Sequence, residues 1–462
     1  MRTSIPPHLR FLTYAPLEYR DVRSRLFLAA IGFGLLVRLA TIPLPGHDDV
    51  ITWKIWSYAA TQDLTGMYGV GGSPPERGIV QWGEHRTTVD YPPFFLYEYA
   101  VVGRLFRAAF PGYPDGLALL AAVKLPVLLA NGAMTWLLYM AVWTATRREA
   151  PAQWAALAYW LNPATMFGGE MLGYVDPLLT LPAVAGLVLA WRGRRFWAGA
   201  LVAIAVATKP QAILIGPAFA LLLWQSAGLA GVMQAGITFG ATLFAIVLPF
   251  MLRGAMGNMW LAFGSFYARR DTMSAFAANI GWLINWGLRS WFAVPELGWQ
   301  AFLQVVPRPL AISRFQELGY PNPRPICATV IAVVIAWATW VAARGRDLGI
   351  AAAFGAFTVH TFFVLNVGMH ESHQLFEVPL LVLAAALRPA LRPIAIVVST
   401  IITLNINFYY GISLGWGWAI PRQITGVDVS VALAFLNIAT LAWLGSALAS
   451  VSHDTESIPA AA

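Results

Sequence analysis

Two neighbouring carboxylates, Asp48 and Asp49, follow the first long apolar run of the sequence, directly after His47. A carboxylate at a membrane boundary can serve as a general base, and a second one beside it can tune its pKa or bind a metal ion. Acidic residues are also favoured at the N-cap of a helix, so the pair alone fits a structural role equally well. The pair is a candidate catalytic site, and its function depends on which other residues of the chain lie beside it.

A further acidic site lies in Asp90-Tyr91-Pro92-Pro93. The two prolines fix an extended turn that holds Asp90 at its edge. Alternatively, Asp90 caps a helix that starts near residue 94. Asp176, which precedes Pro177, has the same two interpretations: an acidic group at the outer end of a span, or a helix cap before proline.

Cationic side chains that could hold a phosphate occur at three places: Lys209, Arg269-Arg270, and Met369-His370-Glu371-Ser372-His373. Adjacent arginines suit a phosphate because guanidinium groups bind it in a bidentate manner, although they could also anchor to lipid headgroups. The lysine could pair with a lipid phosphate or extend along the membrane boundary. Two histidines and a glutamate within four residues favour a functional role.

Metal binding has less support. His370 and His373 are three residues apart, which is not the H-E-x-x-H spacing of zinc proteases. Cys327 is the single cysteine, so the chain has no internal disulfide and no cysteine-rich metal site. We expect no metal site and assign no cofactor; a divalent cation is not expected.

The composition places these residues in a membrane protein. Hydrophobic residues make up 58% of the 462 residues and charged residues only 11%, whereas soluble domains carry about 25% charge. The net charge of +8 reflects basic residues at the ends of apolar runs. We therefore expect membrane lipids, and no nucleic acid, as partners.

The apolar runs predict an all-α polytopic membrane protein with about 12 transmembrane helices. The predicted spans lie near residues 25–44, 116–144, 152–170, 176–192, 196–208, 210–226, 230–252, 325–343, 348–367, 374–390, 394–414 and 429–450. Two segments are ambiguous. Residues 94–110 are apolar but carry three charges, and 196–225 is one long helix or two that separate at Lys209-Pro210.

Short basic loops tend to stay in the cytoplasm, and this tendency favours one arrangement. If 94–110 lies in the interface and Lys209-Pro210 is a turn, every short basic loop falls on the cytoplasmic side together with both termini. Residues 45–115 and 253–324 then form large external loops. Within the first, an amphipathic helix is predicted over 49–63, because Val50, Trp53, Trp56 and Ala60 have helical spacing. Residues 94–110 form the second interfacial helix.

The order of these motifs resembles that of the GT-C superfamily of polyprenyl-phosphate-sugar glycosyltransferases, in particular dolichol-pathway glucosyltransferases and bacterial membrane mannosyltransferases. The likeness rests on Asp90-Tyr91-Pro92-Pro93 and on Asp49, which precedes Trp56 by seven residues as the family's external aspartate does. Thr208-Lys209-Pro210-Gln211 is similar to the family's F-K-P/Q turn. Residues 369–373 resemble its H-E-K or M-H-E-R motif, except that Ser372 stands where Lys or Arg is expected. The likeness covers roughly 25–210 and is patchier afterwards.

The resemblance implies a GT-C fold: a shared transmembrane module at 1–252, a long external loop at 253–324 and a variable transmembrane module at 325–462. It implies an inverting transfer of mannose or glucose from a polyprenyl-phosphate donor to a lipid-linked or glycan acceptor on the external face of the membrane, the cell membrane if the source is bacterial. Asp49 would be the base, with Asp48 and Asp90 also catalytic. The implied donor-phosphate ligands are Lys209, Arg269, Arg270, His370 and His373, and the substrate-orienting residues are Asp176, Tyr91 and Glu371.

Two other functions fit parts of the pattern. A lipid or sugar transporter or flippase would use charges inside the membrane, for which the candidates are Arg38, Lys124, Glu170 and Glu377. No inverted repeat of spans is evident, however, and the candidate site residues all fall on one face. A transferase that uses a soluble nucleotide sugar would need its acidic site in the cytoplasm, which the basic loops oppose.

The topology predicts which positions are reachable from outside an intact cell. Tags at Arg147, Arg194, Arg346 and Arg388 should be protected from a membrane-impermeant label, and tags near Pro74 and Gly298 should react with it. Labelling of Arg194 and Pro74 to the same extent would contradict the arrangement.

Overall fold

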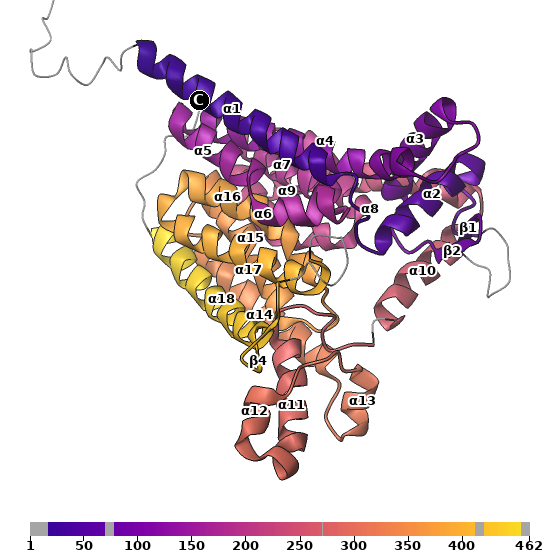
Figure 1. The fold of residues 1–462 in the computed structure, drawn as a ribbon. Helices are drawn as coiled ribbons and strands as arrows, with labels where there is room; N and C mark the ends of the chain where they lie inside the picture. The colour runs from indigo at the N-terminus through magenta and orange to yellow at the C-terminus, as the bar shows by residue number, and fades with distance from the viewer. Residues whose placement is uncertain (1–16, 70–77, 270, 412–419, 454–462) are drawn as a thin grey trace, which may run out of the picture.

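The computed structural model describes residues 17–69, 78–269, 271–411 and 420–453. These residues form helices almost throughout (Figure 1). Two short antiparallel pairs are the only sheets in the described ranges: β1 (Ile79–Trp82) with β2 (His85–Thr88), and β3 (Gln423–Ile424) with β4 (Val427–Asp428). The predicted all-α architecture is confirmed.

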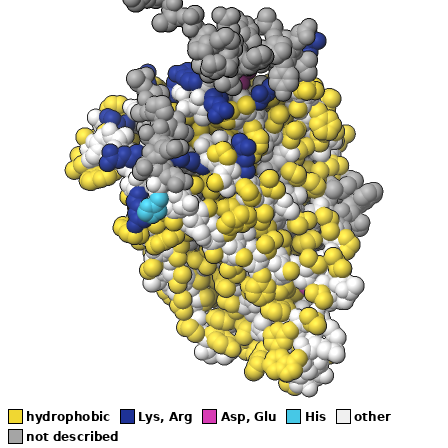
Figure 2. Space-filling model, turned by 90° about the vertical axis from the view of Figure 1, so that its left-hand side faces the viewer, with side chains coloured by type: hydrophobic (Ala, Val, Ile, Leu, Met, Phe, Trp, Pro, Cys, Tyr) yellow, Lys and Arg dark blue, Asp and Glu magenta, His cyan; other side chains and the backbone are white. Residues whose placement is uncertain are grey.

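Seven helical stretches of the described chain are long and apolar enough to cross a membrane. They lie within α1 (Leu17–Thr41), α4 (Leu117–Thr146), η3 (Pro210–Ile215) with α9 (Gly216–Leu252), α14 (Pro323–Ala342), α15 (Leu348–Leu365), η6 (Pro389–Leu391) with α17 (Arg392–Tyr410), and α18 (Val429–His453). Figure 2 shows hydrophobic side chains covering most of one face of the molecule, as a bilayer requires. The chain is therefore a helical membrane protein.

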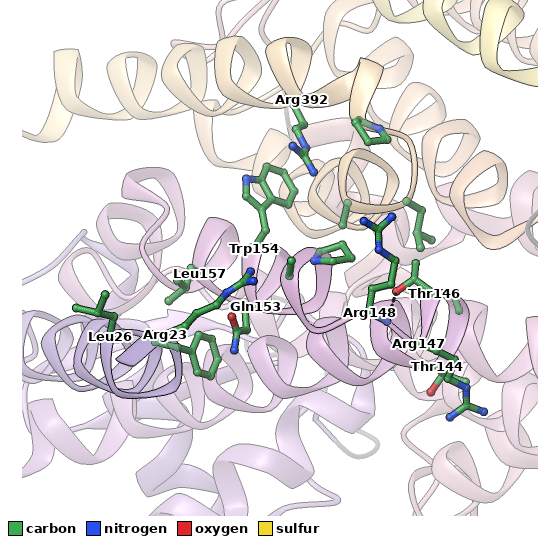
Figure 3. A pocket seen from close by; sticks show the side chains of 17 residues that line it. Arg23, Leu26, Thr144, Thr146, Arg147, Arg148, Gln153, Trp154, Leu157 and Arg392 are labelled. Atoms are coloured by element: carbon green, nitrogen blue, oxygen red, sulfur yellow. Dashed lines mark hydrogen bonds between the residues drawn. The ribbon is translucent and has the colours of Figure 1, made fainter. Parts of the chain in front are cut away.

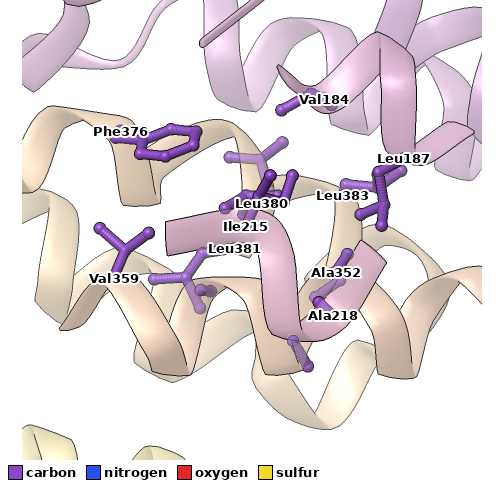
Figure 4. Close-up of a cluster of buried hydrophobic side chains, with 14 of the residues drawn as sticks. Val184, Leu187, Ile215, Ala218, Ala352, Val359, Phe376, Leu380, Leu381 and Leu383 are labelled. Atoms are coloured by element: carbon purple, nitrogen blue, oxygen red, sulfur yellow. The ribbon is translucent and has the colours of Figure 1, made fainter. Parts of the chain in front are cut away.

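The remaining predicted spans are shorter helices, so the number of about twelve stays a prediction. They are α5 (Glu149–Trp160), α7 (Asp176–Trp191), α8 (Arg195–Thr208), and η5 (Glu371–Phe376) with α16 (Glu377–Leu387). Side chains of α7, α9, α15 and α16 form the centre of the core (Figure 4). Nearly every residue of α15 is buried, so this helix packs against other helices on all sides.

The predicted span at 152–170 is wrong as a single helix. α5 ends at Trp160, and the Asn162 side chain then accepts from the Ala164 N–H to cap the short helix α6 (Pro163–Met166). A π-helical turn, η2 (Phe167–Met171), follows. Pro163 cannot continue the hydrogen bonding of α5, which explains the break inside an apolar run.

The prediction of separate helices on either side of Lys209-Pro210 is confirmed. α8 ends at Thr208, and Lys209 has an extended backbone. The stretch after it is also divided, because Ala227 and Gly228 have non-helical dihedral angles within α9. That interruption falls between the predicted spans 210–226 and 230–252.

Several basic turns lie close together at one end of the bundle. Arg23, Arg147, Arg148 and Arg392 line the same cavity. The neighbouring Arg388 pairs with Asp347 at 2.6 Å. Figure 2 shows Lys and Arg side chains gathered at one end of that face. The charge distribution predicted such a common end; that it is cytoplasmic stays a prediction.

The first long loop contains α2 (Asp49–Asp63) and α3 (Pro93–Ala109), close to the ranges predicted for them. The apolar stripe of α2 packs against α3 rather than standing alone at a surface: Trp53 and Trp56 are buried against Phe95. α3 exposes Val101 and Leu105 on its outer side.

The second long loop contains α10 (Met256–Arg269), α11 (Ile280–Leu297), η4 (Gly298–Gln300), α12 (Ala301–Gln304) and α13 (Ile312–Glu317). Of these, α11, α12 and α13 project away from the bundle in Figure 1.

A buried ion pair ties α1 to the broken segment. Arg38 and Glu170 are in contact and fully buried. Arg38 also donates to the Trp160 carbonyl at 2.8 Å, and Asn131 of α4 donates to Glu170 Oε1 at 2.9 Å. The pair thereby satisfies a carbonyl that the end of α5 leaves open.

Glu170→Ala should destabilise the protein strongly, because it leaves the Arg38 charge buried without a partner. The expected cost is about 3–5 kcal/mol, measured as a loss of thermal stability in detergent. Asp115→Ala is the matched control. It removes a pair with Lys54 whose carboxylate is 54% exposed, and should cost about 1 kcal/mol or less. Equal effects of the two substitutions would contradict a structural role for Arg38 and Glu170.

Candidate active site

Segments that are distant in the sequence meet at one end of the bundle. The His47 ring lies 4.9 Å from that of Tyr174 and 4.6 Å from that of Tyr410, between centroids. Tyr174 donates to Glu371 Oε1 at 2.5 Å. α8 runs from Arg195 in a basic turn to Thr208 beside Lys209, so the site and that turn are about 20 Å apart along the helix.

Two glycine turns bring the first loop against the broken segment. Gly46 and Gly173 have φ angles of +87° and +80°, and a Cβ atom on either would lie within 2.8 Å of the Val50 side chain. Between them, the His47 N–H donates to the Leu172 carbonyl at 2.8 Å. Only glycine allows both this backbone conformation and this close approach.

Lys124 of α4 fixes the same contact from within the bundle. Its Nζ donates to the Leu44 carbonyl at 2.6 Å and to the Met171 carbonyl at 2.8 Å. The two carbonyls belong to the two turns that meet at Gly46 and Gly173. One buried ammonium group thus joins the start of the acidic loop to the segment that carries Tyr174.

Asp49 and His47 form an ion pair, with Asp49 Oδ2 and His47 Nδ1 3.5 Å apart. Burial raises the pKa of Asp49. The hydrogen bond and charge of His47, together with the charges of Lys209 and His370, lower this pKa by a larger amount, so it lies below its ordinary value. Burial lowers the pKa of His47, and its interactions with Asp49, Glu371 and Asp48 raise it above its ordinary value. The carboxylate therefore stays ionised, paired with His47 and stabilised electrostatically by Lys209 and His370.

Asp48 differs from its neighbour. It is exposed and occupies the N-cap position of α2, but its side chain makes no capping hydrogen bond. The predicted capping position of the acidic pair is confirmed without a capping hydrogen bond, and the two carboxylates have different surroundings.

Asp176 and Lys209 form a second, buried ion pair, with Oδ1 and Nζ 2.9 Å apart. Asp176 is the first residue of α7 rather than its cap, so the capping alternative is wrong for this residue. Its Oδ2 atom is buried without a hydrogen-bond partner among the described residues. The Lys209 ammonium lies 5.8 Å from the centroid of the Tyr91 ring.

The Asp90-Tyr91-Pro92-Pro93 turn leads into α3, whose N-cap is Pro92 without a side-chain hydrogen bond. Asp90 therefore does not cap that helix. The Tyr91 ring packs against Trp53 and Phe95, with centroids 5.4 and 4.8 Å away, and its carbonyl accepts from Tyr68 at 2.5 Å. The turn connects the aromatic core of the loop to Lys209.

The residues of the motif at 370–373 lie partly at the surface and partly in the interior. The His370 side chain is 38% exposed, whereas Glu371 is buried and holds Tyr174. Burial raises the pKa of Glu371 above its ordinary value. His373 Nδ1 accepts from the His370 N–H at 3.4 Å, so this ring also shapes the turn.

The second long loop returns to the same turn. The Ala275 N–H donates to the Met369 carbonyl at 2.9 Å, and Asn279 donates to the Asn366 carbonyl at 3.0 Å. Arg270 lies outside the described residues, as does the side chain of Arg269. The loop segment that follows the two arginines is thus placed beside His370, whereas the arginine side chains are not.

Sequence reasoning missed three residues as members of this site. His47 belongs to the acidic motif, and its position two residues before Asp49 was a usable signal. Tyr174 stands in the motif around Asp176. Tyr410 closes α17, and no local pattern distinguishes it from other boundary aromatics.

The four charges that a transporter could use all have protein partners. Arg38 and Glu170 bind each other, and Lys124 holds two carbonyls. Glu377 accepts from His360 at 2.8 Å, and both are fully buried. These charges support the structure of the bundle rather than line an open path.

No group of three or more His, Cys, Asp or Glu side chains in the described ranges is arranged to hold a metal ion. Comparison with known proteins finds no matching family model and no matching curated protein.

The His47–Asp49 pair should make a pH-dependent contribution to stability. Because the pKa of His47 is raised, its contribution is full below 6.5 and is lost as the pH rises through the folded value. Because the pKa of Asp49 is lowered, its contribution is full above 3.8 and is lost as the pH falls. His47→Gln should therefore lower the Tm most between these two values and less well above 6.5.

The effect should be about 1 kcal/mol or less, because the Asp49 side chain is 47% exposed. Asp115→Asn is the control. Burial raises the pKa of Asp115, but the hydrogen bond and charge of Lys54 lower it by more, so this carboxylate is ionised above 3.8 and the change in Tm should stay constant from there upward. A pH-independent effect of His47→Gln would show that the ring acts by packing alone.

Proposed function

We propose that this protein is an inverting GT-C glycosyltransferase, which moves mannose or glucose from a polyprenyl-phosphate donor to a lipid-linked or glycan acceptor. The proposal includes about twelve passes and a site on the non-cytoplasmic face. The observation that carries it is the position of the ionised Asp49 carboxylate, which interacts with the charges of Lys209 and His370 at one end of an apolar bundle.

The reaction needs a base on one reactant and cations on the other. Asp49 takes the proton of the acceptor hydroxyl as its oxygen bonds to the anomeric carbon. The bond from that carbon to the phosphate oxygen breaks at the same time, and its electron pair leaves with the phosphate. The leaving group is already an anion, so cations stabilise it without a general acid.

In the proposal, Lys209 and His370 hold that phosphate. Lys209 uses one donor on Asp176 and has two further N–H groups for a ligand. The exposed ring of His370 lies beside the loop segment that follows Arg269-Arg270. In the proposal, both arginines and His373 complete the phosphate site, Asp176 orients the acceptor, and Tyr91 and Glu371 position their neighbours.

The transporter alternative has no observation in its favour. The buried charges that motivated it are bound to protein groups.

Asp49→Asn should abolish most turnover while leaving the fold and donor binding intact, because the amide keeps the shape of the side chain but cannot accept a proton. Loss of a general base costs about 10²–10⁴ in rate. The assay is single-turnover transfer from polyprenyl-phosphate mannose and polyprenyl-phosphate glucose by purified protein, with and without EDTA.

Asp115→Asn is the matched control, since it removes a carboxylate of the same loop outside the site and should keep full activity. Near-native turnover by folded Asp49→Asn would exclude it as the base. Transfer by the wild-type protein from neither donor would count against the transferase itself.

A further inference from the structure

A large cavity lies at the basic end of the bundle, away from the candidate active site. Its volume is about 1110 Å³, and it lies between α1, the turn from α4 to α5, and the turn from α16 to α17 (Figure 3). Arg23, Arg147, Arg148 and Arg392 line it. Neither Asp nor Glu is among the described residues that line it, so this described lining is strongly cationic.

The arginines have capacity for a ligand. Arg392 lies over the Trp154 ring, 4.8 Å from its centroid, and its Nε atom is buried without a hydrogen-bond partner among the described groups. Arg23 and Arg148 are exposed. Arg388, in the adjoining turn, is already paired with Asp347 and does not line the cavity. Guanidinium groups placed in this way suit a phosphate.

The cavity continues into an apolar groove. A second cavity of about 440 Å³ shares Trp154 and Leu157 with the first and runs between α5 and α17. It is lined mainly by apolar side chains, and Ile396 at its edge is 64% exposed. A ligand that fills both cavities has an anionic head and a hydrocarbon tail.

We infer that this joined pocket binds an anionic membrane phospholipid, with its phosphate held by Arg23, Arg148 and Arg392 and an acyl chain in the groove between α5 and α17. Basic pockets between membrane helices hold anionic headgroups for this reason. A free phosphate or nucleotide would satisfy the arginines and leave the groove empty. The inference does not depend on the proposed transferase activity.

The test is native mass spectrometry of the full chain in detergent with added phosphatidylglycerol or phosphatidylcholine of the same acyl chains. The wild-type protein should retain phosphatidylglycerol preferentially. Arg148→Gln with Arg392→Gln should weaken that binding about tenfold or more, as expected for lost hydrogen bonds to a charged group. Arg192→Gln with Arg194→Gln is the control. It makes the same change in charge outside the pocket and should leave binding unchanged.

Two further arms separate the possible ligands. Ala158→Phe fills the groove and should weaken the binding of long-chain phosphatidylglycerol, whereas inorganic phosphate should not displace the lipid. If the Arg392 variant has no melting transition, Arg23→Gln with Arg148→Gln replaces it, because both side chains are exposed. Equal retention of the two lipids, an equal loss in the control, or displacement by inorganic phosphate would overturn the inference.

Discussion

The interior of a membrane offers no water to the open carbonyls of a broken helix, so each of them needs a donor from the protein. This chain breaks a helix between Trp160 and Asp176, and Arg38 and Lys124 supply donors there. Arg38 closes the end of α5, and Lys124 closes the turn at Met171 while also holding Leu44. The break would be costly without these two cations, and the candidate site could not form without the break.

The lack of water inside the membrane also determines the electrostatics of the site. Three acidic groups there have an identified partner: Asp49 has His47, Asp176 has Lys209, and Glu371 has Tyr174. The three pairs differ in exposure, since Asp176 and Glu371 are buried whereas Asp49 is half-exposed. Proton transfer to an incoming hydroxyl needs a carboxylate that is both ionised and accessible, and Asp49 is the one of these three that meets both conditions.

Local patterns were sufficient to predict the elements that carry the site. The spacing of Val50, Trp53 and Trp56 predicted α2, and the prolines after Asp90 and Lys209 predicted the start of α3 and the end of α8. The break after Trp160 was missed because hydrophobicity continues across it, and the signal was the short sequence Asn162-Pro163. Hydropathy measures the preference of side chains for lipid over water. That preference is the same for an intact and a broken helix in a membrane, so hydropathy does not reveal the break.

Pairing between distant residues is the part that local patterns could not supply. Asp176 and Lys209 were each predicted as site residues, but with separate partners: an acceptor for one and a phosphate for the other. Their ion pair joins the two groups, so a phosphate held by Lys209 shares that lysine with the buried Asp176 carboxylate. Tyr410 likewise enters the site only because α17 packs against the broken segment.

The two ends of the bundle use cations in opposite ways, and the difference follows from burial. At the site end, Lys124 and Lys209 are buried, and protein carbonyls or a carboxylate already accept hydrogen bonds from them. At the other end, Arg23, Arg147 and Arg148 are exposed, and the described lining of their cavity includes no carboxylate. An anion that reaches the site end must compete with protein groups for the lysines, which favours a ligand that is bound only while it reacts. An anion at the arginine end meets no such competition, which favours a ligand that stays bound.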